Sequence, residues 1–180
     1  MQKLFVKRKC VSMESLYDMS WDKAPEIVAE VRNDKGEAST MPDQRSSKVK
    51  ALDPNEYPEV CKELLTFIPG WNRQLEENYR VGELQYLIYH RGDHFKRHKD
   101  SGYKGNTEFE SNRIFSTSTI ISMTDDIQGG KFLIWDKDNG SHQVDIEVGE
   151  TIFFDSRSLH EITKVLSGTR EVLVAWIHKR

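Results

Sequence analysis

The chain has 180 residues, of which 37% are hydrophobic and 31% are charged. This composition is ordinary for a soluble globular protein, and the length allows one sizeable core, so we expect a single domain over residues 1–180. The net charge of −3 and the pI near 6.1 give no global reason to expect binding to nucleic acid or to a membrane.

Two further features bear on the compartment of the protein. No stretch approaches the roughly 18 to 20 apolar residues that cross a bilayer, and the first residues lack the apolar region of a secretory leader. Cys10 and Cys61 have neither a Cys-x-x-Cys spacing nor the density of a disulfide scaffold, so we expect free thiols. Both observations favour a reducing, cytoplasmic location.

The N-terminal third contains few clear elements. Residues 4–6 are apolar and are expected to form an edge strand, whereas residues 34–49 are polar around Pro42 and are expected to form a surface loop. Asp53 before Pro54 is typical of the start of a helix, and apolar residues at helical spacing extend it to residue 68. Pro58 falls within the first turn or so, where a missing N–H is tolerated, so we predict one helix over residues 54–68.

From residue 81 onward, short apolar runs are separated by turn residues. This pattern favours an antiparallel β body over alternating helices and strands. The sequence therefore predicts a mainly β protein with N-terminal helices and a double-stranded β-helix core, the jelly roll found in cupins. Residues 1–80 would form a helix-containing support region that covers one sheet, and residues 81–180 would form the jelly-roll catalytic core.

A metal site is predicted by a His-x-Asp pair and one distant histidine. Residues i and i+2 of a strand point to the same side, so His98 and Asp100 can bind one metal while Lys99 points away. The third ligand must come from another strand, and His160 is the candidate. Two imidazoles and one carboxylate form the facial triad of non-haem Fe(II) oxygenases. The alternative is that both histidines are ordinary buried residues held by hydrogen bonds.

Residues 84–177 resemble the catalytic domain of the 2-oxoglutarate/Fe(II)-dependent oxygenases, most closely the prolyl-4-hydroxylase-like branch. The resemblance rests on several elements in the family's order. They are the Tyr89-x-x-Gly92 segment that leads into His98-x-Asp100, Arg113 at the start of a strand, residues 129–132, residues 153–162 around His160, Gly168-Thr169-Arg170, and Trp176.

The resemblance implies Fe(II), 2-oxoglutarate as cosubstrate, O2 and ascorbate as reductant. His98, Asp100 and His160 would be catalytic as metal ligands, and Arg170 would bind the C5 carboxylate of 2-oxoglutarate, because a guanidinium can bind a carboxylate through two hydrogen bonds. Tyr89 would line the cosubstrate pocket. Ile120 stands where many prolyl hydroxylases carry a second pocket tyrosine, and Ser118, on the same face of the strand, is the candidate replacement. Arg170 in a surface ion pair and Tyr89 in the core are the alternatives.

Asp100 favours hydroxylation, because the halogenating members of the superfamily carry a small residue in its place. The resemblance implies hydroxylation of a prolyl residue in a protein or peptide. Tyr103, Phe95 and Trp135 are candidate walls of the substrate groove, and residues 101–112 are a candidate lid. Oxidation of a free amino acid or small molecule is the second possibility. A non-catalytic, cupin-like module that binds metal or 2-oxoglutarate is the third. The sequence leaves the oligomeric state open.

Overall fold

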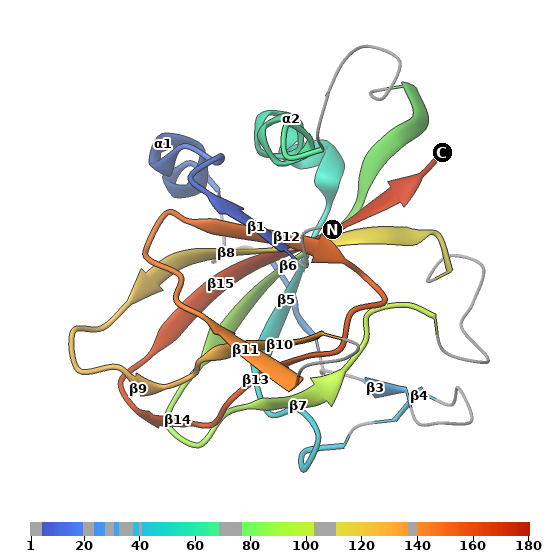
Figure 1. Cartoon of the computed structure of the whole chain (residues 1–180). Coiled ribbons are helices and arrows are strands. Elements are labelled where there is room, and N and C mark those ends of the chain that lie inside the picture. Colours follow the sequence, from blue (N-terminus) through green and yellow to red (C-terminus); the bar gives the residue numbers. More distant parts are fainter. Residues whose placement is uncertain are drawn as a thin grey trace.

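The protein is built on two antiparallel sheets that face each other (Figure 1). The computed structural model describes residues 5–19, 24–27, 31–32, 38–39, 41–68, 77–102, 111–136 and 140–180. The larger sheet has seven strands in the order β1 (Phe5–Arg8), β12 (Thr151–Asp155), β8 (Arg113–Met123), β15 (Arg170–Lys179), β6 (Tyr79–Tyr89), β5 (Lys48–Leu52) and β2 (Glu26–Ile27). The smaller has four, in the order β11 (Gly140–Val144), β10 (Phe132–Asp136), β13 (His160–Ile162) and β7 (Phe95–His98).

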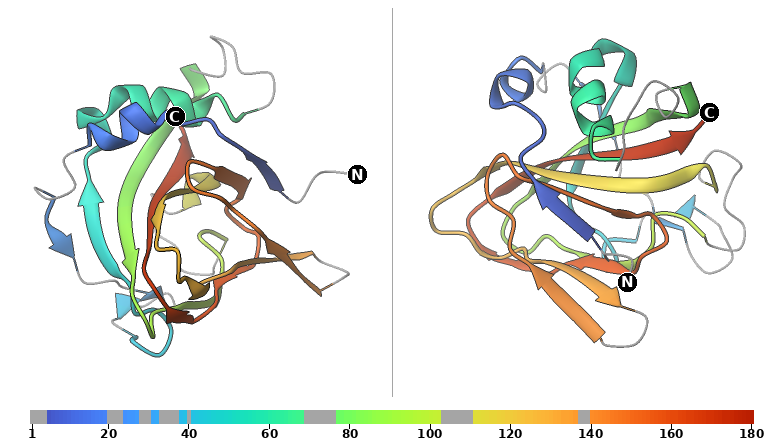
Figure 2. Two further views of the ribbon diagram at one scale, coloured as in Figure 1. Left: turned by 90° about the vertical axis from the view of Figure 1, so that its left-hand side faces the viewer. Right: turned by 45° about the horizontal axis from the view of Figure 1, so that its top comes forward.

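Two short ribbons complete the strands that the structure describes. They are β14 (Val165–Ser167) with β9 (Gln128–Gly129), and β3 (Val31–Arg32) with β4 (Ala38–Ser39). The two main sheets curve around a shared interior, as the end-on view in Figure 2 shows. This arrangement confirms the predicted jelly roll with N-terminal helices.

The interior between the sheets is apolar because the strands alternate. β15 lies between β8 and β6 in the large sheet, and its register places Val172 beside Leu87 and Ile120. Bulky apolar side chains of this kind, above all the β-branched Val172 and Ile120, fit a pleated, half-buried surface. From the facing sheet, Phe132 and Ile134 of β10 join the same buried cluster. The predicted site residues lie within this layer.

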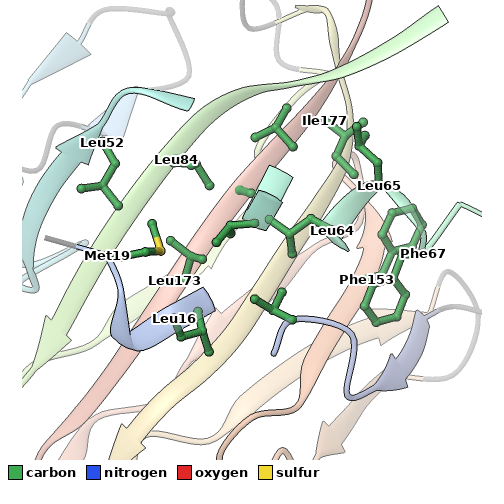
Figure 3. Close-up of a cluster of buried hydrophobic side chains, with 14 of the residues drawn as sticks. Leu16, Met19, Leu52, Leu64, Leu65, Phe67, Leu84, Phe153, Leu173 and Ile177 are labelled. Atoms are coloured by element: carbon green, nitrogen blue, oxygen red, sulfur yellow. The ribbon is translucent and has the colours of Figure 1, made fainter. Parts of the chain in front are cut away.

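The helices cover the other face of the large sheet. α1 (Met13–Tyr17) is capped by Ser12, whose hydroxyl oxygen accepts a hydrogen bond of 3.0 Å from the backbone N–H of Ser15. α1 and α2 (Pro58–Leu65) pack their apolar sides on this face (Figure 3). Leu16 and Leu64 are fully buried there, and the rings of Phe67 and Phe153 stack with centroids 5.6 Å apart. Truncating either leucine to alanine should cost about 2 to 5 kcal/mol.

The single helix predicted over residues 54–68 is wrong. The chain forms a 3-10 turn, η2 (Pro54–Glu56), and then a separate helix, α2, which ends at Leu65. Pro58 is the cause, because a proline disfavours helical backbone in the residue before it. Tyr57 accordingly takes φ −129° and ψ 55°. The predicted start is confirmed, since the carboxylate of Asp53 accepts a 2.9 Å hydrogen bond from the backbone N–H of Asn55.

Two other predictions concern the N-terminal third. The edge strand predicted over residues 4–6 is found as β1, and Leu4 lies outside the described residues. The surface loop predicted over residues 34–49 is wrong in part, because β4 falls within it and β5 begins at Lys48. Residues 44–46 also pair with β7: the Lys96 N–H donates to the Gln44 carbonyl at 2.8 Å and the Ser46 N–H to the His94 carbonyl at 3.1 Å.

In the described part of the chain, no helix is long and apolar enough to cross a membrane.

Candidate active site

Three predicted metal ligands meet between the two sheets. His98 is the last residue of β7 and His160 the first of β13, and the two are direct partners in the ladder that joins these strands. One carboxylate oxygen of Asp100 lies 3.5 Å from Nε2 of His98, and the other lies 3.6 Å from Nε2 of His160. One ligand atom from each residue lies within 4.8 Å of the other two. These separations suit three ligands of one metal ion.

The route by which Asp100 reaches the site differs from the prediction. β7 ends at His98, so Asp100 lies in the bend that follows the strand and not on the strand itself. His98 and Asp100 are neighbours at the site as predicted, but strand alternation is not what brings them together. Contacts from other elements hold this residue instead.

Both histidines are hydrogen-bonded in the manner of metal ligands. Nδ1 of His98 lies 2.8 Å from the Lys96 carbonyl, and Nδ1 of His160 lies 3.0 Å from the Ser158 carbonyl. A carbonyl only accepts, so each Nδ1 carries a proton, and each Nε2 is the ring nitrogen that faces Asp100 and is placed to bind a metal. Burial and the neighbouring His98 lower the pKa of His160 to about 4. Its ring is therefore neutral at pH 7, as metal binding requires.

Asp100 supplies the negative charge of the cluster. Burial alone would raise the pKa of its carboxyl group, but the adjacent imidazoles and a 2.6 Å hydrogen bond from the Ser116 hydroxyl outweigh burial and hold the pKa well below its usual range. The two nitrogen donors and one ionised oxygen donor fit a divalent iron ion of the facial-triad type.

Arg170 is a buried cation beside this cluster. It begins β15, its side chain is 2% exposed, and its Nη1 donates a 2.6 Å hydrogen bond to the Gly130 carbonyl. Burial lowers the pKa of Arg170 to about 10, so the group stays charged at neutral pH. Among the described residues, its Nε has no hydrogen-bond partner and no carboxylate lies within ion-pair distance of it. A buried guanidinium with a spare donor fits an anionic ligand such as a carboxylate.

The other predicted pocket residues divide into two groups. Tyr89, paired with Arg170 across the sheet, is buried with its ring 5.9 Å from the Arg170 guanidinium carbon. It lines the same pocket as the triad, and so does Ser118. Ile120 is buried in the apolar layer between the sheets and is absent from the pocket lining.

Phe95 lines the pocket, whereas Trp135 does not. The Phe95 ring stacks on His98 with centroids 3.4 Å apart. The centroid of the Trp135 ring lies 5.3 Å from the guanidinium carbon of Arg97, and Trp135 does not line this pocket, so its place in a substrate groove stays a prediction. Tyr103 and most of the candidate lid, residues 103–110, lie outside the described residues.

Sequence reasoning missed Arg45, a second arginine in the pocket. Its side chain is 8% exposed, and its guanidinium carbon lies 4.6 Å from the centroid of the Phe95 ring. Its Nε donates to the Ser47 hydroxyl at 3.2 Å, and burial lowers its pKa. No sequence signal marks this residue, because only the pairing of residues 44–46 with β7 brings it to the site.

Trp176 was predicted to be a structural neighbour of the site. It lines the pocket, and its buried indole N–H has no hydrogen-bond partner in the part of the chain that the structure describes. Among the described residues, Trp176 and Arg170 are thus two lining residues that each carry a buried N–H without a hydrogen-bond partner. Buried polar groups of this kind usually have a partner, and a ligand with acceptor oxygens is one candidate.

Part of the chain is similar to curated hydroxylases. A PKHD-type hydroxylase of Rippkaea orientalis is 30% identical over 98 residues, which are 54% of this chain and 43% of that protein. A PKHD-type hydroxylase of Shewanella sp. is 29% identical over 89 residues, or 49% of this chain and 39% of that protein. The chain thus matches less than half the length of these relatives.

Solved structures support the fold. A 2OG-Fe(II) oxygenase family protein of Burkholderia pseudomallei superposes with a TM-score of 0.67 at 13% identity, covering 98% of this chain and 86% of that one. A Pseudomonas putida prolyl-4-hydroxylase gives 0.65 at 15% identity, covering 99% and 94%. Residues 84–178 also match the family model of the 2OG-Fe(II) oxygenase superfamily. The chain is therefore a member of the 2OG-Fe(II) oxygenase superfamily.

Proposed function

We propose that this protein is an Fe(II)- and 2-oxoglutarate-dependent dioxygenase that hydroxylates a prolyl residue in a protein or peptide. The observation that carries the proposal is the position of Arg170, a buried guanidinium with an unused donor, in the same pocket as His98, Asp100 and His160. One pocket thus offers a metal-ligand set and a cation for a dicarboxylate.

Each group has a role in this proposal. Nε2 of both histidines and the Asp100 carboxylate would hold Fe(II), and Arg170 would bind the far carboxylate of 2-oxoglutarate. When bound, iron and 2-oxoglutarate supply the oxidation, in which one atom of O2 enters succinate, the other enters the substrate, and CO2 leaves. The chain's own part is to orient both ligands and to exclude water with the buried walls at Tyr89, Phe95 and Trp176.

A peptide substrate is supported by structural relatives. A prolyl hydroxylase from Trichoplax adhaerens, solved with a fragment of a hypoxia inducible factor, superposes with a TM-score of 0.66 at 12% identity, covering 98% of this chain and 84% of that one. Arg45 adds a second cation that could bind a carbonyl or carboxylate of a peptide, since its guanidinium has no carboxylate partner among the described residues. A requirement for ascorbate and a cytoplasmic location are parts of the same proposal.

The test is succinate formation by purified protein supplied with Fe(II), 2-oxoglutarate, ascorbate and O2. A panel of proline-containing peptides should stimulate succinate release, and mass spectrometry should find one added oxygen on proline. A matched set of free amino acids separates the small-molecule alternative from the peptide substrate. Binding of 2-oxoglutarate without succinate under every condition would contradict the proposal and favour a non-catalytic binding module.

A further inference from the structure

Asp100 is the metal-ligand candidate that the sheets do not hold. Its backbone N–H and that of Ser101 both donate to the Ser156 carbonyl, at 2.9 Å and 3.0 Å. Nη1 of Arg113 donates to the Asp100 carbonyl at 3.2 Å. The backbone of this bend is thus tied to the turn after β12 and to the start of β8, both remote in sequence.

The carboxylate of Asp100 is held by two serine hydroxyls in series. The hydroxyl oxygen of Ser116 lies 2.6 Å from Oδ2 of Asp100 and 2.9 Å from the hydroxyl oxygen of Ser156. Both serines are completely buried. An ionised carboxylate can only accept, so Ser116 gives its single proton to Asp100, and Ser156 must donate to Ser116. The direction of both hydrogen bonds is therefore fixed.

This series constrains the two oxygens of Asp100 differently. Oδ2 receives the Ser116 proton, whereas Oδ1 faces Nε2 of His98 at 3.5 Å. A carboxylate without this bond could rotate about its last torsion or turn both oxygens to the metal, because that torsion has a broad energy minimum. Hydrogen bonds that orient a ligand in this way typically strengthen metal binding.

We propose that Ser116, supported by Ser156, is a positioning residue that fixes the orientation of the Asp100 carboxylate for metal binding. The inference rests on the metal site of the proposed function. Neither serine lines the pocket, and the Ser116 hydroxyl contacts Asp100 directly, so we expect their effect to pass through Asp100.

The neighbouring strands β8 and β12 contain a matched control. The hydroxyls of Thr119 on β8 and Thr151 on β12 lie 2.7 Å apart, and both residues are completely buried. This pair resembles Ser116 and Ser156 in chemistry and burial, but neither threonine lines the pocket. Replacing Thr119 by valine removes one buried hydroxyl at nearly constant volume. It therefore separates loss of a buried hydrogen bond from loss of ligand positioning.

The test measures Co(II) binding to metal-free protein by titration, together with the visible absorption spectrum of bound Co(II) and the thermal midpoint without metal. Ser116→Ala should weaken Co(II) binding about 10- to 100-fold and change the spectrum, as expected for loss of a ligand-orienting bond. Ser116→Thr keeps the hydroxyl and should restore binding. Ser156→Ala should weaken binding less than Ser116→Ala. Thr119→Val should lower the thermal midpoint and leave Co(II) binding and the spectrum unchanged.

Several results would overturn the inference. If Ser116→Ala bound Co(II) as tightly as the wild type, the Ser116 hydroxyl would have no part in positioning Asp100. If Thr119→Val weakened Co(II) binding as much as Ser116→Ala, the effect would come from the loss of stability that follows removal of any buried hydroxyl. If Ser116→Ala does not fold, Ser156→Ala is the variant that tests the inference. Unchanged Co(II) binding by Ser156→Ala would then contradict the proposal that the two serine hydroxyls together orient the Asp100 carboxylate. Wild-type protein that binds no Co(II) would refute the metal site as well, which distinguishes failure of the proposed function from failure of the serine series alone.

Discussion

Glu83 and Arg113 join two strands of the large sheet across the strand that lies between them. Nε and Nη2 of Arg113, on β8, each donate a 2.6 Å hydrogen bond to a different carboxylate oxygen of Glu83, on β6. The guanidinium carbon lies 4.4 Å from the ring of Trp176 on the intervening β15. This ion pair therefore lies over a pocket residue, and Arg113 also reaches the Asp100 carbonyl.

Arg113→Ala should destabilise the protein by about 1 to 3 kcal/mol, because it leaves the half-buried Glu83 carboxylate without its main donor. Urea unfolding of the metal-free protein measures the change. Arg157→Ala is the control, since its 2.6 Å pair with Asp155 involves an arginine side chain that is 70% exposed. Loss of such an exposed pair should cost about 1 kcal/mol or less. Equal losses for the two variants would contradict the importance of the Glu83 pair.

The same carboxylate should make stability depend on pH. Burial alone would raise the pKa of Glu83, but hydrogen bonds and charges from His178 and Arg113 outweigh it and lower the pKa below the ordinary value of 4.5. A carboxyl group with a lowered pKa in the folded state stabilises the protein above its unfolded pKa, and this contribution disappears as the pH falls below that value. Between pH 7 and pH 3.5, the free energy of unfolding should fall less for Glu83→Gln than for the wild type. If the free energies of unfolding of the two proteins fell in parallel over this range, this prediction would be contradicted.

Arg170→Gln should separate cosubstrate binding from metal binding. The variant keeps all three metal-ligand candidates, so its affinity for Mn(II) should match that of the wild type. Its affinity for 2-oxoglutarate should fall at least about tenfold, because a charge-assisted pair of hydrogen bonds is lost. Calorimetric titration of the Mn(II)-loaded protein measures both. Unchanged 2-oxoglutarate affinity would show that another group, with Arg45 the first candidate, binds the far carboxylate.

Both cysteines should react slowly in the folded protein. Burial is the main cause that raises the pKa of Cys10 to about 11 and that of Cys61 to about 12, so little thiolate exists at pH 8. Iodoacetamide should modify both thiols far more slowly in buffer than in concentrated urea. Mass spectrometry over time gives the two rates, and rapid labelling of either residue in the folded state would contradict the assigned burial.

The elements that sequence reasoning found share a local signal. β8, β12 and β15 were recognisable as runs of β-branched and aromatic residues bounded by turns. The spacing of His98 and Asp100, with His160 and Arg170 in the order of a known family, was enough to select residues that the structure brings into one pocket.

The features that were missed depend on contacts between remote segments. Arg45 enters the pocket because its segment pairs with β7, and nothing in the polar sequence around it signals that pairing. Asp100 is held by Ser116 and Ser156, which lie in different elements. Tyr57 breaks the predicted helix because of a local effect of Pro58 that helical periodicity does not register.

The most direct test of the account is a crystal structure of the protein with Mn(II) and N-oxalylglycine, a non-reactive analogue of 2-oxoglutarate. The account predicts one metal ion bonded to Nε2 of His98, Nε2 of His160 and one oxygen of Asp100, with the far carboxylate of the analogue on the Arg170 guanidinium. A metal ion bound elsewhere, or an analogue whose far carboxylate avoids Arg170, would contradict it.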